Sequence, residues 1–208
     1  MIEYILNSNP DDRILKRAID SLSSGEIIVV PTDTNWVFVG DPYQKKAVEK
    51  LYRIKGVDSD HHFSLLLDSI SRATEVAEIS DSAFRLIRNK VPGNYTFIFN
   101  ATKKMRKVLK ASRRDQQVGL RFVPVIFIQK LLEFYKGPLI STNIREEMFP
   151  NKTSLQEIYS FEIEDVLGHE VSMIIDPGDS VIKGPSTIYD LRNDEFQLVR
   201  EGIGSDFL

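Results

Sequence analysis

The pattern of hydrophobic and polar positions alternates along the chain between short apolar runs and segments with helical spacing. The first apolar run, residues 27–30, follows a glycine and a glutamate and ends at Pro31. A continuous run of this length is typical of a strand that is buried on both faces of a sheet. Before it, Asn9-Pro10 is typical of an N-cap followed by proline at the first helical position, and apolar residues within 14–22 then recur at helical spacing. We therefore predict a helix that packs beside a core strand.

Further strands and helices alternate along the rest of the chain. The expected strands lie at residues 36–39, 63–67, 95–99, 118–121, 138–140, 173–175 and 196–199, and another begins at Ser186. The expected helices follow Asp41-Pro42 and Ser80, cover 126–135, and begin at Thr153. Because no long linker, repeat or low-complexity tract interrupts them, we predict one three-layer α/β domain over residues 1–208. Its sheet is expected to be mixed, since some connections are too short for a helical crossover.

Polar residues gather where the predicted core strands end or begin. The run Thr32-Asp33-Thr34 follows the first strand, Ser141-Thr142-Asn143 follows the strand at 138–140, and Ser186-Thr187 begins another. In open α/β sheets, ligands bind outside the carboxyl ends of the strands, so these runs are candidate binding residues. The alternative for the first run is a turn in which the Thr and Asp side chains bond their own backbone.

Isolated cations also lie at the ends of predicted elements. Lys55 ends a predicted helix, Arg121 ends a strand, and Arg200 follows the strand at 196–199. For Lys55 the alternative is a helix cap, because basic residues favour helix C-termini and Gly56 is a suitable following residue. Hydroxyls and cations without a paired carboxylate suit a phosphate-bearing ligand, for which catalysis is mainly orientation and charge stabilisation.

The composition narrows the classes of function. The chain has 208 residues, no cysteine, three histidines and a formal net charge of −3. The lack of cysteine excludes disulfides, thiolate metal sites and a cysteine nucleophile, and the histidines have no metal-ligand spacing. We therefore predict no metal site built from protein side chains. The net charge argues against nonspecific nucleic-acid binding through overall charge.

One local segment, residues 102–117, is strongly basic. Its cations are Lys103, Lys104, Arg106, Lys107, Lys110, Arg113 and Arg114. Such a segment attracts RNA or polyphosphate, and the alternative is a solvated helix face or loop. No apolar run approaches the roughly 20 residues of a membrane span, and the first residues lack the features of a signal peptide. We expect a cytoplasmic protein without membrane association.

Common catalytic signatures are absent, but seven short motifs occur in an informative order. There is no GxxxxGK[ST], GxGxxG, HExxH or GxSxG sequence. The motifs present are Pro31-Thr32-Asp33-Thr34, Lys55-Gly56, Pro92-Gly93-Asn94-Tyr95-Thr96, Gly119-Leu120-Arg121, Ser141-Thr142, Ser186-Thr187 and Arg200-Glu201-Gly202. In this order they resemble the YrdC-like family of L-threonylcarbamoyladenylate synthases, and residues 92–98 and 199–204 look closest to its YciO branch.

The resemblance implies a twisted mixed sheet with a concave, positively charged cleft. It implies that L-threonine, bicarbonate and ATP, bound with Mg²⁺, are condensed to threonylcarbamoyl-AMP with release of pyrophosphate. The product serves modification of adenosine 37 in tRNA, and double-stranded RNA or tRNA is a further implied partner. The alternative is a nucleotide- or double-stranded-RNA-binding protein of tRNA or ribosome metabolism that lacks the synthase reaction.

The resemblance also assigns residues to the threonine side of the site. Thr32, Thr34 and Ser186 would face the threonine substrate. Arg121 would pair with the threonine carboxylate, since a guanidinium can bind a carboxylate through two hydrogen bonds. Lys55 and Arg121 are then the candidate catalytic residues.

The nucleotide side carries two departures from the family pattern. The resemblance assigns Lys55 and Arg200 to the ATP phosphates and Ser141 to the nucleotide. Val57 stands where the family has an arginine, and Asn143-Ile144-Arg145 stands where it has Ser-x-Asn. We take Asn143 and Arg145 as candidate nucleotide ligands, and we expect Arg145 to compensate in part for the missing guanidinium. The expected activity is therefore a slow synthase.

Overall fold

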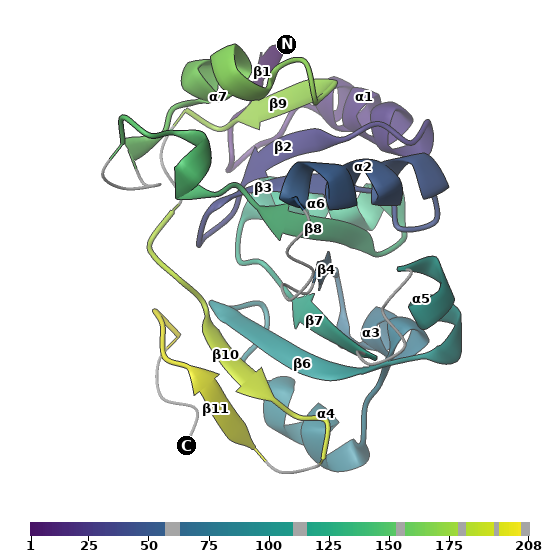
Figure 1. Cartoon of the computed structure of the whole chain (residues 1–208). Helices are drawn as coiled ribbons and strands as arrows, with labels where there is room; N and C mark the ends of the chain where they lie inside the picture. Colours follow the sequence, from purple (N-terminus) through teal and green to yellow (C-terminus); the bar gives the residue numbers. More distant parts are fainter. Residues whose placement is uncertain (57–62, 110–115, 153–156, 179–181, 194–195, 205–208) are drawn as a thin grey trace.

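The computed structural model describes residues 1–208 except 57–62, 110–115, 153–156, 179–181, 194–195 and 205–208. Within the described part, eleven strands form one sheet (Figure 1). They are β1 (Ile2–Tyr4), β2 (Ile28–Pro31), β3 (Trp36–Gly40), β4 (Ser64–Leu66), β5 (Ala77–Glu78), β6 (Tyr95–Ala101), β7 (Gln117–Arg121), β8 (Leu139–Asn143), β9 (Met173–Asp176), β10 (Thr187–Asp190) and β11 (Gln197–Arg200). Their order is β1-β9-β2-β3-β8-β4-β7-β6-β10-β11, and β5 pairs with β6. Parallel and antiparallel pairs both occur, so the predicted α/β class with a mixed sheet is confirmed.

Helices cover both faces of this sheet. They are α1 (Asp12–Ser23), α2 (Lys45–Lys55), α3 (Ile70–Val76), α4 (Asp81–Ile87), α5 (Lys103–Val108), α6 (Ile126–Tyr135), the 3₁₀ turn η1 (Glu146–Met148) and α7 (Ser160–Leu167). Helices α1 and α6 pack with Ile28 and Val30 in one hydrophobic cluster. The helices α2, α3, α4, α5 and α7 pack with Ile27 and Val29 in the other cluster. Because neighbouring strand residues point to opposite faces, the continuous apolar run serves both layers.

The contact between Arg121 and the β2–β3 turn shows that the sheet is not flat. Arg121 of β7 lies opposite Leu66 of β4, and Leu66 lies opposite Leu139 of β8. In a flat sheet this row would lie about 16 Å along the strands from Trp36 at the start of β3, at about 3.3 Å per residue. Arg121 nevertheless contacts Asp33, which precedes Trp36 in the chain, so the sheet brings the β2–β3 turn against the end of β7.

The starts of several helices differ from the sequence prediction. The prediction placed them at Asn9-Pro10 and Asp41-Pro42, whereas side-chain hydrogen bonds to nearby backbone N–H groups place them later in the chain. Helix α1 is capped by Asp11, whose carboxylate accepts from Arg13 N, and not by Asn9. Asp41 forms a turn by accepting from Tyr43 N, so α2 begins only after Gln44. The predicted start of a helix at Thr153 lies outside the described residues, and α7 occupies the acidic segment that follows.

Strand β8 extends beyond its predicted end. The sequence places Ser141-Thr142-Asn143 after the strand, whereas these residues belong to it and pair with Val37–Val39 of β3. The hydroxyl groups therefore alternate between the two faces of the sheet and do not form one loop. Strands β1 and β5 were not predicted, because they contain only three and two residues.

Candidate functional site

The turn between β2 and β3 is held by its own hydroxyl groups. Thr32 donates to Asn35 O through both its backbone N and its Oγ1, each at 2.8 Å. The Oγ1 of Thr32 also accepts from the backbone N of Asn35 at 3.1 Å and of Thr34 at 3.2 Å. Thr32 is fully buried. The self-bonded turn, which was the alternative interpretation, is therefore present, and Thr32 shapes it.

Arg121 joins the end of β7 to this turn. Its Nη2 donates to Asp33 Oδ1 and its Nη1 donates to Thr34 Oγ1, each at 2.6 Å. The ion pair is almost fully buried, with 6% of the Arg121 side chain and 2% of the Asp33 side chain exposed. Burial lowers the pKa of Arg121, and the carboxylate of Asp33 opposes this change. The Nε of Arg121 is fully buried and has no hydrogen-bond partner among the described residues.

Asp33 connects four segments of the chain. Besides Arg121, its carboxylate accepts from Asn94 Nδ2 at 2.6 Å, and its carbonyl accepts from Lys183 N at 2.7 Å. In the sequence, Asp33 was named only as part of a polar run and Asn94 only as part of a motif, and neither residue was given a role of its own. Both lie inside motifs that carry the family resemblance, Pro31-Thr32-Asp33-Thr34 and Pro92-Gly93-Asn94-Tyr95-Thr96. Their place in these motifs was the sequence feature that could have identified them as site residues. Asp33 thus aligns the turn, β7 and the segment that leads into β10.

A second group of predicted residues meets at the start of β10. Ser186 Oγ shares a hydrogen bond of 2.9 Å with Thr96 Oγ1. Arg200 Nη2 donates to the carbonyl oxygen of Ser186 at 2.7 Å and to its Oγ at 3.1 Å. Partial burial lowers the pKa of Arg200, and the charge of Arg200 also lowers the pKa of Arg121. Asn94, whose carbonyl accepts from Thr187 N, links this group to the turn.

Two glycines of the motifs are explained by close approach. A Cβ atom on Gly119 would lie 2.9 Å from Ser64 Oγ, which is closer than side-chain packing allows. A Cβ atom on Gly202 would lie 2.3 Å from the carbonyl oxygen of Pro185, next to Ser186. The glycines therefore let β4 approach β7 and let the chain after Arg200 lie against Ser186.

The nucleotide-side residues are less closely connected. Lys55 is the last residue of α2, but its side chain and all of Val57 lie outside the described residues. Ser141 is buried and donates to Ser64 O at 3.2 Å. Asn143 and Arg145 are exposed. A Cβ atom built on Gly56 would lie 3.8 Å from Arg145 Nη2, so the guanidinium of Arg145 reaches the end of α2.

Part of the basic segment is already engaged with protein groups. The Nζ atom of Lys104 lies 5.4 Å from the ring centroid of Tyr43. Arg106 bonds Gln116 and pairs with Glu78 at 3.9 Å. The side chains of Lys103 and Lys107 are exposed. Lys110, Arg113 and Arg114 lie outside the described residues, and binding of RNA to this segment stays a prediction.

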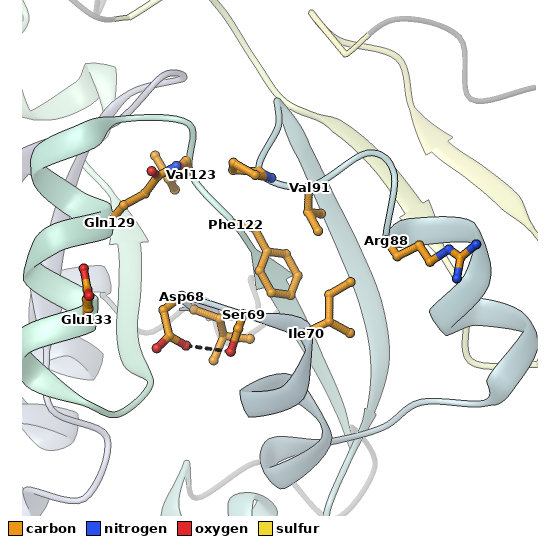
Figure 2. A pocket seen from close by; sticks show the side chains of 11 residues that line it. Asp68, Ser69, Ile70, Arg88, Val91, Phe122, Val123, Gln129 and Glu133 are labelled. Carbon is orange, nitrogen blue, oxygen red and sulfur yellow. Dashed lines mark hydrogen bonds between the residues drawn. The ribbon is translucent and has the colours of Figure 1, made fainter.

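A cavity of about 530 Å³ lies beside the site and not in it. Figure 2 shows Phe122 at its centre, with Gln129 and Glu133 from α6 on one side and Arg88 on the other. Phe122 directly follows Arg121, and its carbonyl accepts from Gly93 N at 2.9 Å. None of the residues predicted for the site lines this cavity. The convergence of polar groups at the turn therefore defines the candidate site better than the cavity does.

The described residues contain neither a metal-binding cluster nor a membrane-spanning helix. No group of three or more His, Cys, Asp or Glu side chains there is arranged to hold a metal ion. No helix in the same part of the chain is long and apolar enough to cross a membrane.

Comparison with known proteins places this geometry in context. The family Sua5_yciO_yrdC, described as telomere recombination, matches residues 20–202. Escherichia coli K12 YciO, an uncharacterized protein, is 34% identical over 202 residues, which cover 97% of this chain and 95% of YciO. The crystal structure of E. coli YciO matches with a TM-score of 0.85 and 33% identity, covering 99% of this chain and 97% of that one.

More distant relatives carry functional names. A putative threonylcarbamoyl-AMP synthase of Methanocaldococcus jannaschii is 26% identical over 200 residues, covering 96% of this chain and 91% of that protein. The crystal structure of P. abyssi Sua5 complexed with L-threonine matches with a TM-score of 0.80 and 19% identity. It covers 97% of this chain and 57% of the Sua5 chain, and it shows a shared fold.

Proposed function

Because the chain belongs to the Sua5/YciO/YrdC family, we propose that it is a nucleotidyltransferase similar to threonylcarbamoyl-AMP synthases. The proposed reaction joins L-threonine, bicarbonate and ATP to give threonylcarbamoyl-AMP, pyrophosphate and water. The observation that carries the proposal is the buried network in which Arg121 binds both Asp33 and Thr34. A relative named as a putative synthase and a Sua5 structure with L-threonine support it further.

The threonine end of the site is proposed to lie at the turn. Arg121 would pair with the threonine carboxylate, since a charge-assisted hydrogen bond at a buried position is strong. Thr34 is only partly buried and, with Ser186, would contact the rest of the amino acid. Thr32 would act indirectly, because its hydroxyl is already bonded within the turn.

The nucleotide end is proposed to be formed by Lys55, Arg145 and Arg200, with Ser141 and Asn143 beside them. In phosphoryl and nucleotidyl transfer, catalysis depends on positioning and on stabilising the charge that develops on the phosphates. Mg²⁺ would enter with ATP, held by its phosphate oxygens, because the described side chains form no metal-binding cluster. The threonine amine would add to bicarbonate with loss of water to give a carbamate, and a carbamate oxygen would then attack the α-phosphorus as pyrophosphate leaves.

Release of pyrophosphate tests this proposal directly. A synthase releases pyrophosphate from ATP only when threonine and bicarbonate are both present, so omission of either should return the rate to background. We expect a slow reaction, because Val57 supplies no donor where the family has arginine. ATP binding without any threonine-dependent pyrophosphate release would contradict the synthase and leave the alternative, a protein that only binds nucleotide.

RNA binding is a second candidate function, favoured by the exposed cations of α5. Lys103 and Lys107 have no ion-pair or hydrogen-bond partner among the described residues, so they are free to contact phosphates. We propose that tRNA or double-stranded RNA binds here, in the cytoplasm where tRNA is modified. The affinity should fall steeply with salt and fall again when Lys103, Lys104, Arg106 and Lys107 are replaced by alanine. A gel shift in which this variant binds tRNA like the parent would contradict the proposal.

A further inference from the structure

We propose that the turn of residues 32–36 couples the two ends of the site, so that L-threonine and the ATP polyphosphate strengthen each other's binding. The turn carries Thr34 at the threonine end. Through Asn35 and Trp36 it also holds Arg145 beside the end of α2. The inference rests on the proposed function, because it assigns threonine and ATP to these two ends.

The first step is the attachment of the Arg145 backbone to the turn. Ile144, which directly precedes Arg145, donates its N–H to Trp36 O at 2.9 Å. Its carbonyl accepts from Asn35 Nδ2 at 3.0 Å. Ile144 is fully buried. Both polar backbone groups of the residue before Arg145 are therefore bonded to two consecutive residues of the turn.

The second step is the position of the Arg145 side chain. Arg145 caps η1, where its carbonyl accepts from Met148 N at 3.1 Å, so its backbone is fixed on both sides. Its guanidinium is exposed, lies beside Gly56, and forms no hydrogen bond or ion pair with the described residues. A fixed backbone with an unpaired cation at its edge suits an anionic ligand. The simpler alternative is that Arg145 only stabilises the negative end of the α2 dipole.

The third step is the connection within the turn. The carbonyl of Asn35 accepts two hydrogen bonds from Thr32, and Thr32 Oγ1 lies 3.1 Å from Thr34 Oγ1. Asn35 is 5% exposed, and its Oδ1 has no partner among the described residues. Asn35 is therefore bonded to Thr32 through its backbone carbonyl and to Ile144 through its side-chain Nδ2. A ligand that contacts Thr34 therefore acts on a turn whose hydrogen bonds reach Ile144, the residue before Arg145.

Coupling of this kind is reciprocal. If threonine improves the affinity for ATP by some factor, ATP must improve the affinity for threonine by the same factor. Typical factors are about 5 to 150. AMP lacks the β- and γ-phosphates, so any contribution of Arg145 to those phosphates is absent when AMP is the ligand. AMP is therefore the matched ligand that separates a polyphosphate contact from a general loss of the site.

Calorimetric titration with Mg·ATP, with and without saturating L-threonine, tests the inference. In the parent protein we expect threonine to lower the Kd for ATP by about 5-fold or more. Arg145→Ala should weaken ATP binding by about 10-fold and leave AMP binding unchanged. Asn35→Ala removes the side-chain Nδ2 donor but keeps the backbone carbonyl. In this variant, the factor by which threonine improves the affinity for ATP should therefore fall to about one. Arg88→Ala, which removes an exposed guanidinium elsewhere, should change none of these values.

Each outcome separates this inference from the proposed function. An unchanged ATP affinity in Arg145→Ala would overturn the inference and leave Arg145 as a helix cap. ATP binding that is insensitive to threonine in the parent would also overturn it, while threonine-dependent pyrophosphate release would still support the synthase. Coupling without pyrophosphate release would support the inference and contradict the synthase. If Asn35→Ala fails to fold, Arg145→Ala still decides, because Arg145 is exposed.

Discussion

The two ends of the site differ in how far the protein itself completes them. At the threonine end, Arg121, Asp33 and Thr34 bond one another in a buried network. At the proposed nucleotide end, Asn143 and Arg145 are exposed, and the guanidinium of Arg145 has no polar partner in the part of the chain that the structure describes. The proposed threonine end is part of the folded core, whereas these two side chains of the proposed nucleotide end lie at the surface.

The two main departures from the family pattern, Val57 and Asn143-Ile144-Arg145, both belong to the proposed nucleotide end. The motif Pro31-Thr32-Asp33-Thr34 is retained, and Trp36 after it is a milder departure, in place of the usual tyrosine. A buried ion pair changes at a high cost, because loss of one partner leaves an uncompensated charge. An exposed cation changes at little cost to folding. Substitutions at the threonine end should therefore affect stability, and those at the nucleotide end should affect ligand binding or rate alone.

The largest expected effect is the loss of stability in Arg121→Ala. The substitution leaves the Asp33 carboxylate buried without its cation, and breaking a buried ion pair typically costs about 3 to 5 kcal/mol. We expect a decrease of this size in the free energy of unfolding, measured by urea denaturation.

Arg88→Ala is the matched control for this prediction, since Arg88 is exposed and has no ion pair among the described residues. Its free energy of unfolding should change by less than about 0.5 kcal/mol. If Arg121→Ala is as stable as Arg88→Ala, the threonine end is not part of the folded core and the contrast between the two ends disappears.

The next largest effect is expected for the rate of Val57→Arg. A preorganised donor that stabilises developing charge is worth about 2.7 to 4 kcal/mol, or about 10² to 10³ in rate. Val57 lies outside the described residues, and the prediction rests on its place after Lys55-Gly56 and on the family pattern. Threonine-dependent pyrophosphate release should rise toward that limit. Val57→Lys controls for charge, and an unchanged rate in both variants would contradict a missing donor at this end.

The elements that the sequence predicted well are those with a strong periodic signal. Helix α6 has the predicted bounds of 126–135, and α4 begins after Ser80 as expected. The core strand β2 was visible because both of its faces are buried. The starts of α1 and α2 were wrong, because Asp11 and Asp41 bond nearby backbone N–H groups that an isolated proline signal does not reveal.

The sequence predicted several residues of the candidate site, but it did not predict the hydrogen bonds that join them. Thr34, Arg121, Ser186 and Arg200 lie in the expected region, but their partners come from distant segments. The bond between Asp33 and Asn94 spans 61 positions, and no local pattern encodes a contact across that separation. For the same reason, the sequence could suggest that Arg145 replaces the missing arginine of the family pattern, but it could not predict the hydrogen bond from Asn35 to Ile144 that holds the Arg145 backbone.

A smaller effect is expected when Lys55 is changed to alanine. Lys55 ends α2 beside Gly56, and a charge-assisted contact with phosphate is worth about 1 to 3 kcal/mol. Calorimetry should show weaker ATP binding by this amount, with an unchanged free energy of unfolding. Lys16→Ala, an exposed lysine on α1, is the control. Equal ATP affinity in the two variants would remove Lys55 from the site.

The smallest effect is expected for Arg145→Lys, which separates charge from geometry at the nucleotide end. Lysine keeps the positive charge but lacks the planar fork through which arginine makes two parallel hydrogen bonds to a phosphate. The loss of one such hydrogen bond costs at least about 0.5 kcal/mol, so the Kd for Mg·ATP should rise by about 2-fold, less than the roughly 10-fold expected for Arg145→Ala. AMP binding and the free energy of unfolding should stay unchanged.

An ATP affinity of Arg145→Lys equal to that of the parent would show that the positive charge at position 145, and not the geometry of the guanidinium, supports ATP binding. A loss as large as that of Arg145→Ala would mean that the nucleotide end is as geometrically demanding as the buried network around Arg121, and the contrast between the two ends would then fail.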